Sequence, residues 1–207
     1  MNLPNRITVG RLVLALLFFA FFKYASLADA AEWWKPAIAC AIFVLAVATD
    51  ALDGYYARKL GLQTDFGRIA DPVVDKIIVA GGLIFLTATS WASAVVPVWM
   101  VVLIIGREFM VSGLRGFIEA KGVAFPSRWD GKLKMILQCI AIPAVFLHRM
   151  VELGWPGERW RWLASAIDWF AVITVWATFV LTMTSGFSYV RRAAQVLRQH
   201  GDAPRAA

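Results

Sequence analysis

The feature that most constrains this chain is the recurrence of long apolar runs between Leu12 and Tyr189, separated by short charged segments. A helix needs about 20 apolar residues to cross the hydrocarbon core of a bilayer, and one such run alone could be a signal peptide. Six runs occur, near residues 12–28, 36–57, 70–90, 95–114, 133–150 and 165–189. The pattern predicts an all-α integral membrane protein with six transmembrane helices.

Composition supports a membrane location for the whole chain. Hydrophobic residues make up 60% of the sequence and charged residues 17%, whereas soluble domains have about 45–50% and about 25%. We expect a single membrane domain over residues 1–207, with a basic cytoplasmic tail at about 191–207. Before the first span, residues 2–10 are expected to form a short amphipathic interfacial helix, in which Pro4 suits a helix start and Arg6 and Arg11 suit lipid phosphates.

The distribution of positive charge predicts the orientation. In the six-span arrangement, 16 of the 21 Lys and Arg residues fall on the side of the termini and five on the other side. Cytoplasmic segments carry the excess of Lys and Arg, so both termini should be cytoplasmic. The net charge of +7 is then explained by anionic lipid, and we expect no nucleic-acid partner. Cys40 and Cys139 lie in apolar runs and show no zinc or disulfide pattern.

Four carboxylates gather at the cytoplasmic ends of the second and third spans. Asp50 and Asp53 are three residues apart, and Asp71 and Asp75 are four apart, so each pair shares one helix face. An antiparallel hairpin can bring the two pairs together. Because like charges raise one another's pKa in apolar surroundings, cations must share the site. Oxygen ligands without Cys or His suit Mg²⁺ or Mn²⁺, and two such ions can clamp a displacement at phosphorus.

The residues beside these acids suit a nucleotide. Gly54, Ala57 and Gly67 are small, and Arg58 lies one helical turn after Gly54, where its guanidinium could hold a phosphate. Each residue alone has an ordinary explanation as helix packing or as a solvated charge. Ionisable residues grouped at a membrane boundary nevertheless favour a functional site.

Eight residues at fixed spacing carry a resemblance to a known family: Asp50, Asp53, Gly54, Ala57, Arg58, Gly67, Asp71 and Asp75. This pattern resembles the signature of the CDP-alcohol phosphatidyltransferases. The resemblance implies six transmembrane helices after an amphipathic N-terminal helix, a homodimer, and two Mg²⁺ or Mn²⁺ ions bound by the four aspartates. It implies that Asp75 is also the general base, that CMP leaves, and that CDP-diacylglycerol contacts Asn5, Gly54, Ala57, Arg58, Thr64 and Gly67.

A separate group of basic residues is the candidate site for the acceptor alcohol. Arg107 and Arg115 are eight residues apart on one expected helix, so they roughly share a face, and Lys132 could join them. Positive charge on the cytoplasmic side would explain the same residues without a ligand. The segments 2–8, 107–115 and 131–134 resemble the branch of the family that uses glycerol 3-phosphate, a step of bacterial phospholipid synthesis in the cytoplasmic membrane. Met135 departs from that branch, which often has a small hydroxyl residue there.

Other functions remain open at this point. Another acceptor, such as an inositol phosphate or phosphatidylglycerol, would keep the same chemistry. A neutral or cationic acceptor would leave Arg107, Arg115 and Lys132 without an anion. A cation transporter also places acids in membrane helices, but it predicts them near the middle of the bilayer rather than at one end.

Overall fold

The computed structural model describes all residues except 1–2, 28–31, 61–64, 124–128, 156 and 202–207. Within its helices, the side chains of residues 3–8, 25–27, 50–60, 65–72, 130, 159, 161 and 199–201 also lie outside the description. Asn5, Thr64 and the side chains of Asp50, Asp53, Arg58 and Asp71 therefore belong to the undescribed part.

The described residues form helices and no strand, which confirms the all-α class. The elements are α1 (Leu3–Leu27), α2 (Trp34–Leu60), α3 (Asp65–Thr87), α4 (Val98–Ala120), α5 (Trp129–Glu152), the short 3₁₀ helix η1 (Glu158–Trp160) and α6 (Arg161–Gly201). Each α-helix overlaps one of the six apolar runs over most of that run. At a rise of 1.5 Å per residue, even the 23-residue helices are about 35 Å long.

The two ends of the chain differ from expectation. The expected interfacial helix is not a separate element in the described residues, because α1 runs without a break from Leu3 to Leu27. Pro4 lies in the first turn, where a missing N–H costs nothing, so the helix continues. At the other end, α6 continues to Gly201, well beyond the expected end at 189 and into the basic tail.

Glycines end α4 and α5 in the same way. Gly122 and Gly154 have φ of 77° and 90°, which a side chain would oppose. Their N–H groups donate to Glu119 and Val151 at 2.9 Å, and the next residues donate to the carbonyls of Ile118 and Met150. This is the Schellman arrangement, and it stops each helix at its loop.

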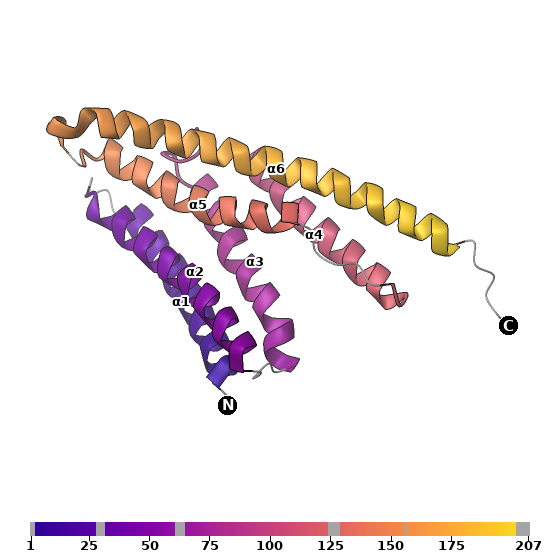
Figure 1. The fold of residues 1–207 in the computed structure, drawn as a ribbon. Coiled ribbons are helices and arrows are strands. Elements are labelled where there is room, and N and C mark those ends of the chain that lie inside the picture. The colour runs from indigo at the N-terminus through magenta and orange to yellow at the C-terminus, as the bar shows by residue number, and fades with distance from the viewer. Residues whose placement is uncertain (1–2, 28–31, 61–64, 124–128, 156, 202–207) are drawn as a thin grey trace.

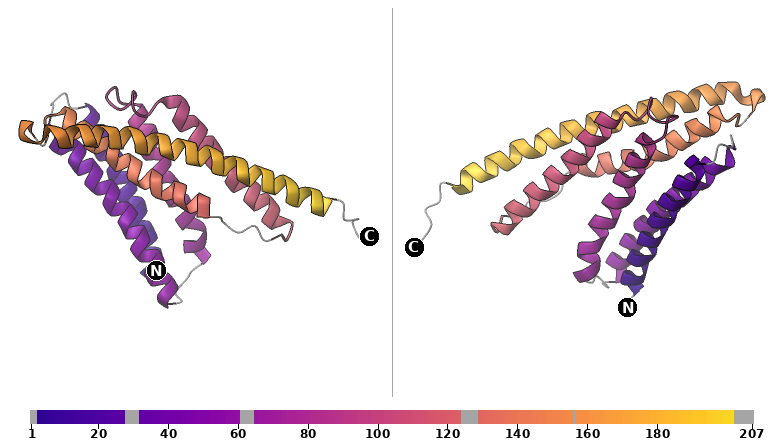
Figure 2. Two further views of the ribbon diagram at one scale, coloured as in Figure 1. Left: turned by 45° about the horizontal axis from the view of Figure 1, so that its top comes forward. Right: turned by 180° about the vertical axis from the view of Figure 1, so that it is seen from behind.

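Helix α1 packs against both α2 and α3, α2 packs against α5, and α6 packs against both α5 and α4. Figure 1 shows the start of α1, the end of α2 and the start of α3 at one end of the molecule. The views in Figure 2 show α6 running along the whole molecule, with its second half beyond α5 and beside α4. Segments that are distant in sequence thus meet around α4 and the second half of α6.

Aromatic side chains fill the core between α1, α2 and α5. The rings of Phe18, Phe43 and Phe146 are fully buried, and Phe18 lies 5.5 Å from Phe43 and 6.1 Å from Phe146 between ring centroids. Gly81 of α3 allows Phe19 to approach closely, because a Cβ at this glycine would overlap the Phe19 ring. The core therefore fixes α1 against α2, α3 and α5.

The outer surface carries large apolar side chains. On α6, Trp169 is 68% exposed and Phe187 is 69% exposed. Two helices contain segments long and apolar enough to cross a membrane, Gly131–Glu152 in α5 and Trp162–Arg198 in α6, among the residues that could be searched. Exposed aromatic and aliphatic residues on such helices are typical of a protein surrounded by lipid.

Candidate active site

The signature residues fall on α2 and α3. Asp50 to Arg58 belong to the last turns of α2, and Gly67 to Asp75 belong to α3, so the acids lie on helices as expected. No metal-binding group of three or more His, Cys, Asp or Glu occurs among the described side chains, but that search does not reach Asp50, Asp53 or Asp71. The arrangement of the four carboxylates remains a prediction.

Asp75 is the one signature carboxylate whose side chain is described. It forms an ion pair with Arg11 of α1, and the Arg11 side chain is only 3% exposed. A cavity of about 10 Å³, enough for about one water, lies beside the pair and is also lined by Met135 and Cys139 of α5. The expectation that Arg11 faces lipid phosphates is wrong, because a guanidinium this deeply buried requires an anionic partner.

Two arginines predicted to bind the acceptor meet at Tyr189 of α6. The guanidinium groups of Arg107 and Arg115 each lie 5.9 Å from the Tyr189 ring centroid. Arg115 Nη2 donates to the Tyr189 hydroxyl at 3.1 Å, and Arg107 Nη2 donates to Ser185 Oγ at 2.9 Å. The structure therefore brings Arg107 and Arg115 together through α6, which the sequence did not indicate.

Lys132 does not join these arginines. Its ammonium group lies 5.0 Å from the Trp129 ring centroid, and its side chain is exposed. Lys134 is buried instead and forms an ion pair with Glu108, which also accepts from Arg107 at 3.3 Å. Residues two apart on a helix point about 200° apart, so only one of the two lysines can face this region.

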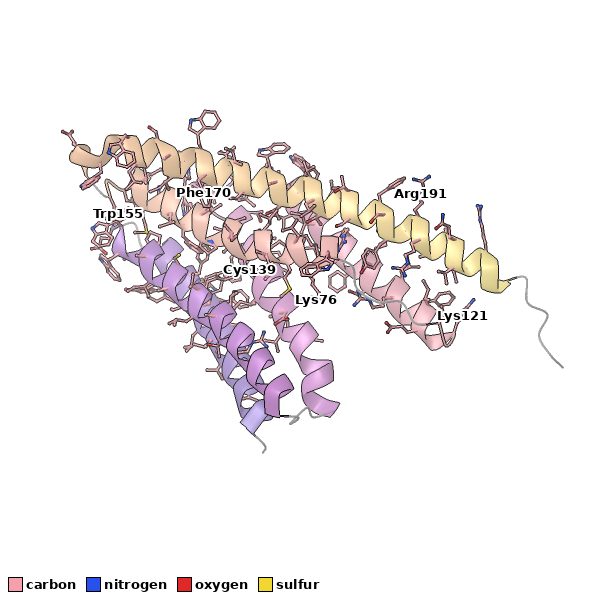
Figure 3. All side chains as sticks on the ribbon, viewed as in Figure 1. Lys76, Lys121, Cys139, Trp155, Phe170 and Arg191 are labelled. Carbon is pink, nitrogen blue, oxygen red and sulfur yellow. The ribbon has the colours of Figure 1, made fainter. Side chains whose placement is uncertain are left out.

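Helix α3 adds a further cation. The Lys76 ammonium group donates to Ser112 Oγ of α4, and Figure 3 shows Lys76 near α5 as well, a helix that contacts α3. The four cations Lys76, Arg107, Arg115 and Lys134, defined here as the basic cluster, thus come from three helices. Among the described side chains, Glu108 is the acid that contacts the cluster.

The basic cluster has donors that no described group satisfies. The Nε atoms of both Arg107 and Arg115 are buried and have no hydrogen-bond partner among the described residues. A buried charge without sufficient counter-charge is costly, and a guanidinium binds phosphate through two parallel N–H groups. These arginines could therefore hold an anion with several oxygens.

Comparison with known proteins identifies the family. The family model described as CDP-alcohol phosphatidyltransferase matches residues 1–190. The chain belongs to the CDP-alcohol phosphatidyltransferase family. The match extends from the start of α1 to Val190 in α6, so it includes Arg11, Asp75 and Tyr189 as well as the signature.

Curated CDP-alcohol phosphatidyltransferases resemble this chain over nearly its whole length. A CDP-diacylglycerol–glycerol-3-phosphate 3-phosphatidyltransferase of Bacillus subtilis is 38% identical over 203 residues, covering 95% of this chain and 97% of the relative. An enzyme of the same name from Rickettsia felis is 34% identical, covering 92% and 94%. A protein of Mycobacterium tuberculosis named "Probable phosphatidylglycerophosphate synthase" is 34% identical, covering 93% and 81%.

Proposed function

We propose that this protein transfers the phosphatidyl group of CDP-diacylglycerol to glycerol 3-phosphate, giving phosphatidylglycerophosphate and CMP in phospholipid synthesis. Family membership and the names of the relatives support the reaction class and the acceptor. The observation that carries the acceptor is the pair of buried, unpartnered Nε donors of Arg107 and Arg115 within the basic cluster. A phosphate monoester supplies the missing acceptors and charge.

The residues of the signature fit the divalent ions that the family uses. Asp50 and Asp53 on α2 and Asp71 and Asp75 on α3 would hold two Mg²⁺ or Mn²⁺, because carboxylate oxygens are the donors these ions prefer. When bound, the ions neutralise charge on the diphosphate and on the leaving CMP. Asp75 takes the proton of the acceptor hydroxyl, and its ion pair with Arg11 holds the carboxylate in place.

The nucleotide end of the substrate would lie beside the signature. In this proposal Asn5, Gly54, Arg58 and Thr64 contact the CDP group, and Ala57 and Gly67 leave room for it. The acceptor lies against Arg107 and Arg115, and Lys134 with Lys76 replaces Lys132 as their cationic neighbour. An inositol phosphate would satisfy the same donors, and phosphatidylglycerol also offers one phosphate, so both stay as alternatives within the family.

The membrane arrangement follows from the helices and the charge distribution. We place all six α-helices across the cytoplasmic membrane, with both termini and the active site in the cytoplasm and with the first turns of α1 at the lipid surface. The homodimer expected from the resemblance is part of this proposal. A cation transporter has no use for the acceptor arginines and is not supported by the family match.

The deciding experiment measures CMP release by the purified protein in detergent with CDP-diacylglycerol and Mg²⁺ or Mn²⁺. The acceptors compared are glycerol 3-phosphate, inositol phosphate, serine and phosphatidylglycerol, each with the wild type and with Asp75→Asn. We expect release with glycerol 3-phosphate alone, and loss of that release in Asp75→Asn and on addition of a chelator. Release with another acceptor would keep the chemistry and overturn the acceptor, whereas no release with any acceptor would overturn the function.

A further inference from the structure

We propose that Ser185, Gly186 and Tyr189 of α6 are positioning residues that hold Arg107 and Arg115 in the orientation that binds the acceptor phosphate. The proposal rests on the acceptor site proposed above. Residues 185, 186 and 189 are spaced so that they lie on one face of α6, and this face packs against α4. We call these three residues the α6 cradle.

Ser185 is fixed as an acceptor for Arg107. Its hydroxyl donates to the carbonyl of Thr182 at 3.1 Å, so the oxygen lone pairs are left to accept from Arg107 Nη2 at 2.9 Å. Ser185 is 3% exposed and Arg107 is 6% exposed. The hydrogen bond is therefore shielded from water, and it holds one end of the guanidinium.

Gly186 provides the space for the Arg107 side chain. A Cβ at this position would lie 2.7 Å from Arg107 Cγ and 3.1 Å from Arg107 Nε. Because Cγ is near the root of the side chain, Arg107 could not avoid the clash by moving its tip alone. The absence of a side chain at Gly186 thus lets Arg107 run close along α6.

Tyr189 holds Arg115 as Ser185 holds Arg107, by accepting a hydrogen bond from it. Its ring is 2% exposed and packs in a small apolar cluster with Val111, Ile118 and Ala193, so the ring position is fixed independently of the arginines. The hydroxyl accepts from Arg115 Nη2, and both guanidinium groups lie beside the ring. Aromatic rings stabilise such cations, particularly when water is excluded.

The cradle contacts do not use the Nε atom of either guanidinium. Contacts with Ser185 and Tyr189 use one terminal nitrogen of each arginine, and both Nε atoms stay without a partner among the described groups. An Nε–H together with a neighbouring N–H is the paired donor that grips a phosphate. The cradle thus holds Nη2 of each arginine, and the proposal assigns the Nε side of each guanidinium to the acceptor phosphate.

The test compares single substitutions in the full-length protein in detergent. Ser185→Ala and Tyr189→Phe each remove one acceptor, Gly186→Ala displaces Arg107, and Thr184→Ala is the control. The Thr184 hydroxyl is exposed and donates to carbonyls of its own helix, Val180 and Leu181. For each variant, kcat and the KM values for glycerol 3-phosphate and CDP-diacylglycerol are measured, together with the melting temperature.

We expect each cradle substitution to raise the KM for glycerol 3-phosphate about tenfold, the scale of a lost hydrogen bond to a charged group. The KM for CDP-diacylglycerol should stay within about twofold, and Thr184→Ala should change neither. Gly186→Ala should also lower the melting temperature, because the clash with Arg107 costs more than the helix preference of alanine over glycine gives back. Ser185→Ala and Tyr189→Phe introduce no such clash and therefore carry the test independently. Equal rises in both KM values, or unchanged values for glycerol 3-phosphate, would overturn the cradle.

A double substitution separates failure of the cradle from failure of the acceptor site. If Tyr189 acts through Arg115, then Tyr189→Phe with Arg115→Gln should be no worse than Arg115→Gln alone. Multiplied effects would contradict the proposed coupling. If Arg115→Gln and Arg107→Gln raise the KM and Tyr189→Phe does not, only the cradle fails. If the two arginine substitutions leave that KM unchanged, the acceptor site fails and the cradle with it.

Discussion

Lys132 and Lys134 differ by two positions on α5, and the helix turns them to opposite sides. Lys134 is buried beside Glu108, whereas Lys132 lies exposed over Trp129. The sequence indicated that a lysine here accompanies the arginines, but the phase of α5 decides which one, and packing sets that phase. Arg11 shows the same limit, since its partner Asp75 is 64 residues away.

Lys134→Ala should therefore raise the KM for glycerol 3-phosphate several-fold, because it removes a positive charge from the basic cluster and leaves Glu108 free to compete for Arg107. Lys132→Ala is the matched control and should change the KM by less than about twofold. Steady-state kinetics with both variants check this. The reverse ranking would show that Lys132 faces the acceptor.

Arg11 and Asp75 should depend on one another for stability. Arg11→Gln leaves the half-buried Asp75 carboxylate without this cation and should destabilise the fold by up to about 3 kcal/mol, whereas Arg11→Gln combined with Asp75→Asn should recover most of that loss. Thermal unfolding in detergent measures both. Equal melting temperatures for Arg11→Gln and the double variant would contradict the pair.

At the scale of the element, the six apolar runs predicted the positions of the helices within a few residues at most ends, because hydrophobic length fixes where a span can lie. The length of α6 was missed, since its last turns are basic. A signal was nevertheless present: Ala193, Val196 and Leu197 have helical spacing and pack in the cluster around Tyr189. The arginines among these residues led to the prediction of a basic tail in place of a continued helix.

The close contact between Gly81 of α3 and Phe19 of α1 can be tested by substitution. Gly81→Ala would push against the Phe19 ring, which is stacked on Phe85 at 5.2 Å, so overpacking should cost about 1–3 kcal/mol. Gly106→Ala is the control, because nothing lies within 4 Å of a Cβ there. Melting temperatures of the two variants test the packing. A Gly81→Ala protein as stable as the control would show that α1 and α3 are not in close contact.

At the scale of the whole molecule, the eight-residue signature allowed the family to be predicted, and the family model confirmed it. The acceptor site was less predictable, because the basic cluster and its cradle come from α3, α4, α5 and α6. Only tertiary packing brings Ser185 near Arg107, 78 residues away. The four-aspartate arrangement lies largely outside the described residues and stays a prediction.

The proposed orientation can be tested by cysteine labelling in a Cys40→Ala, Cys139→Ala background. Lys121 ends α4 and Glu158 lies in η1, beside Trp155, and Figure 3 places Lys121 and Trp155 toward opposite ends of the molecule. In intact cells, a membrane-impermeant maleimide should label Glu158→Cys and not Lys121→Cys. Opened membranes should allow both to react. The opposite labelling would invert the topology.

The continuity of α6 also bears on how damaged genes of this kind should be interpreted. A reading frame that stopped near codon 180 would still encode the complete aspartate signature and the arginines of α4. Its product would lack Ser185, Gly186 and Tyr189, and with them the surface that aligns those arginines. A search for the signature would score such a gene as intact, although its product would lack the α6 residues that contact Arg107 and Arg115.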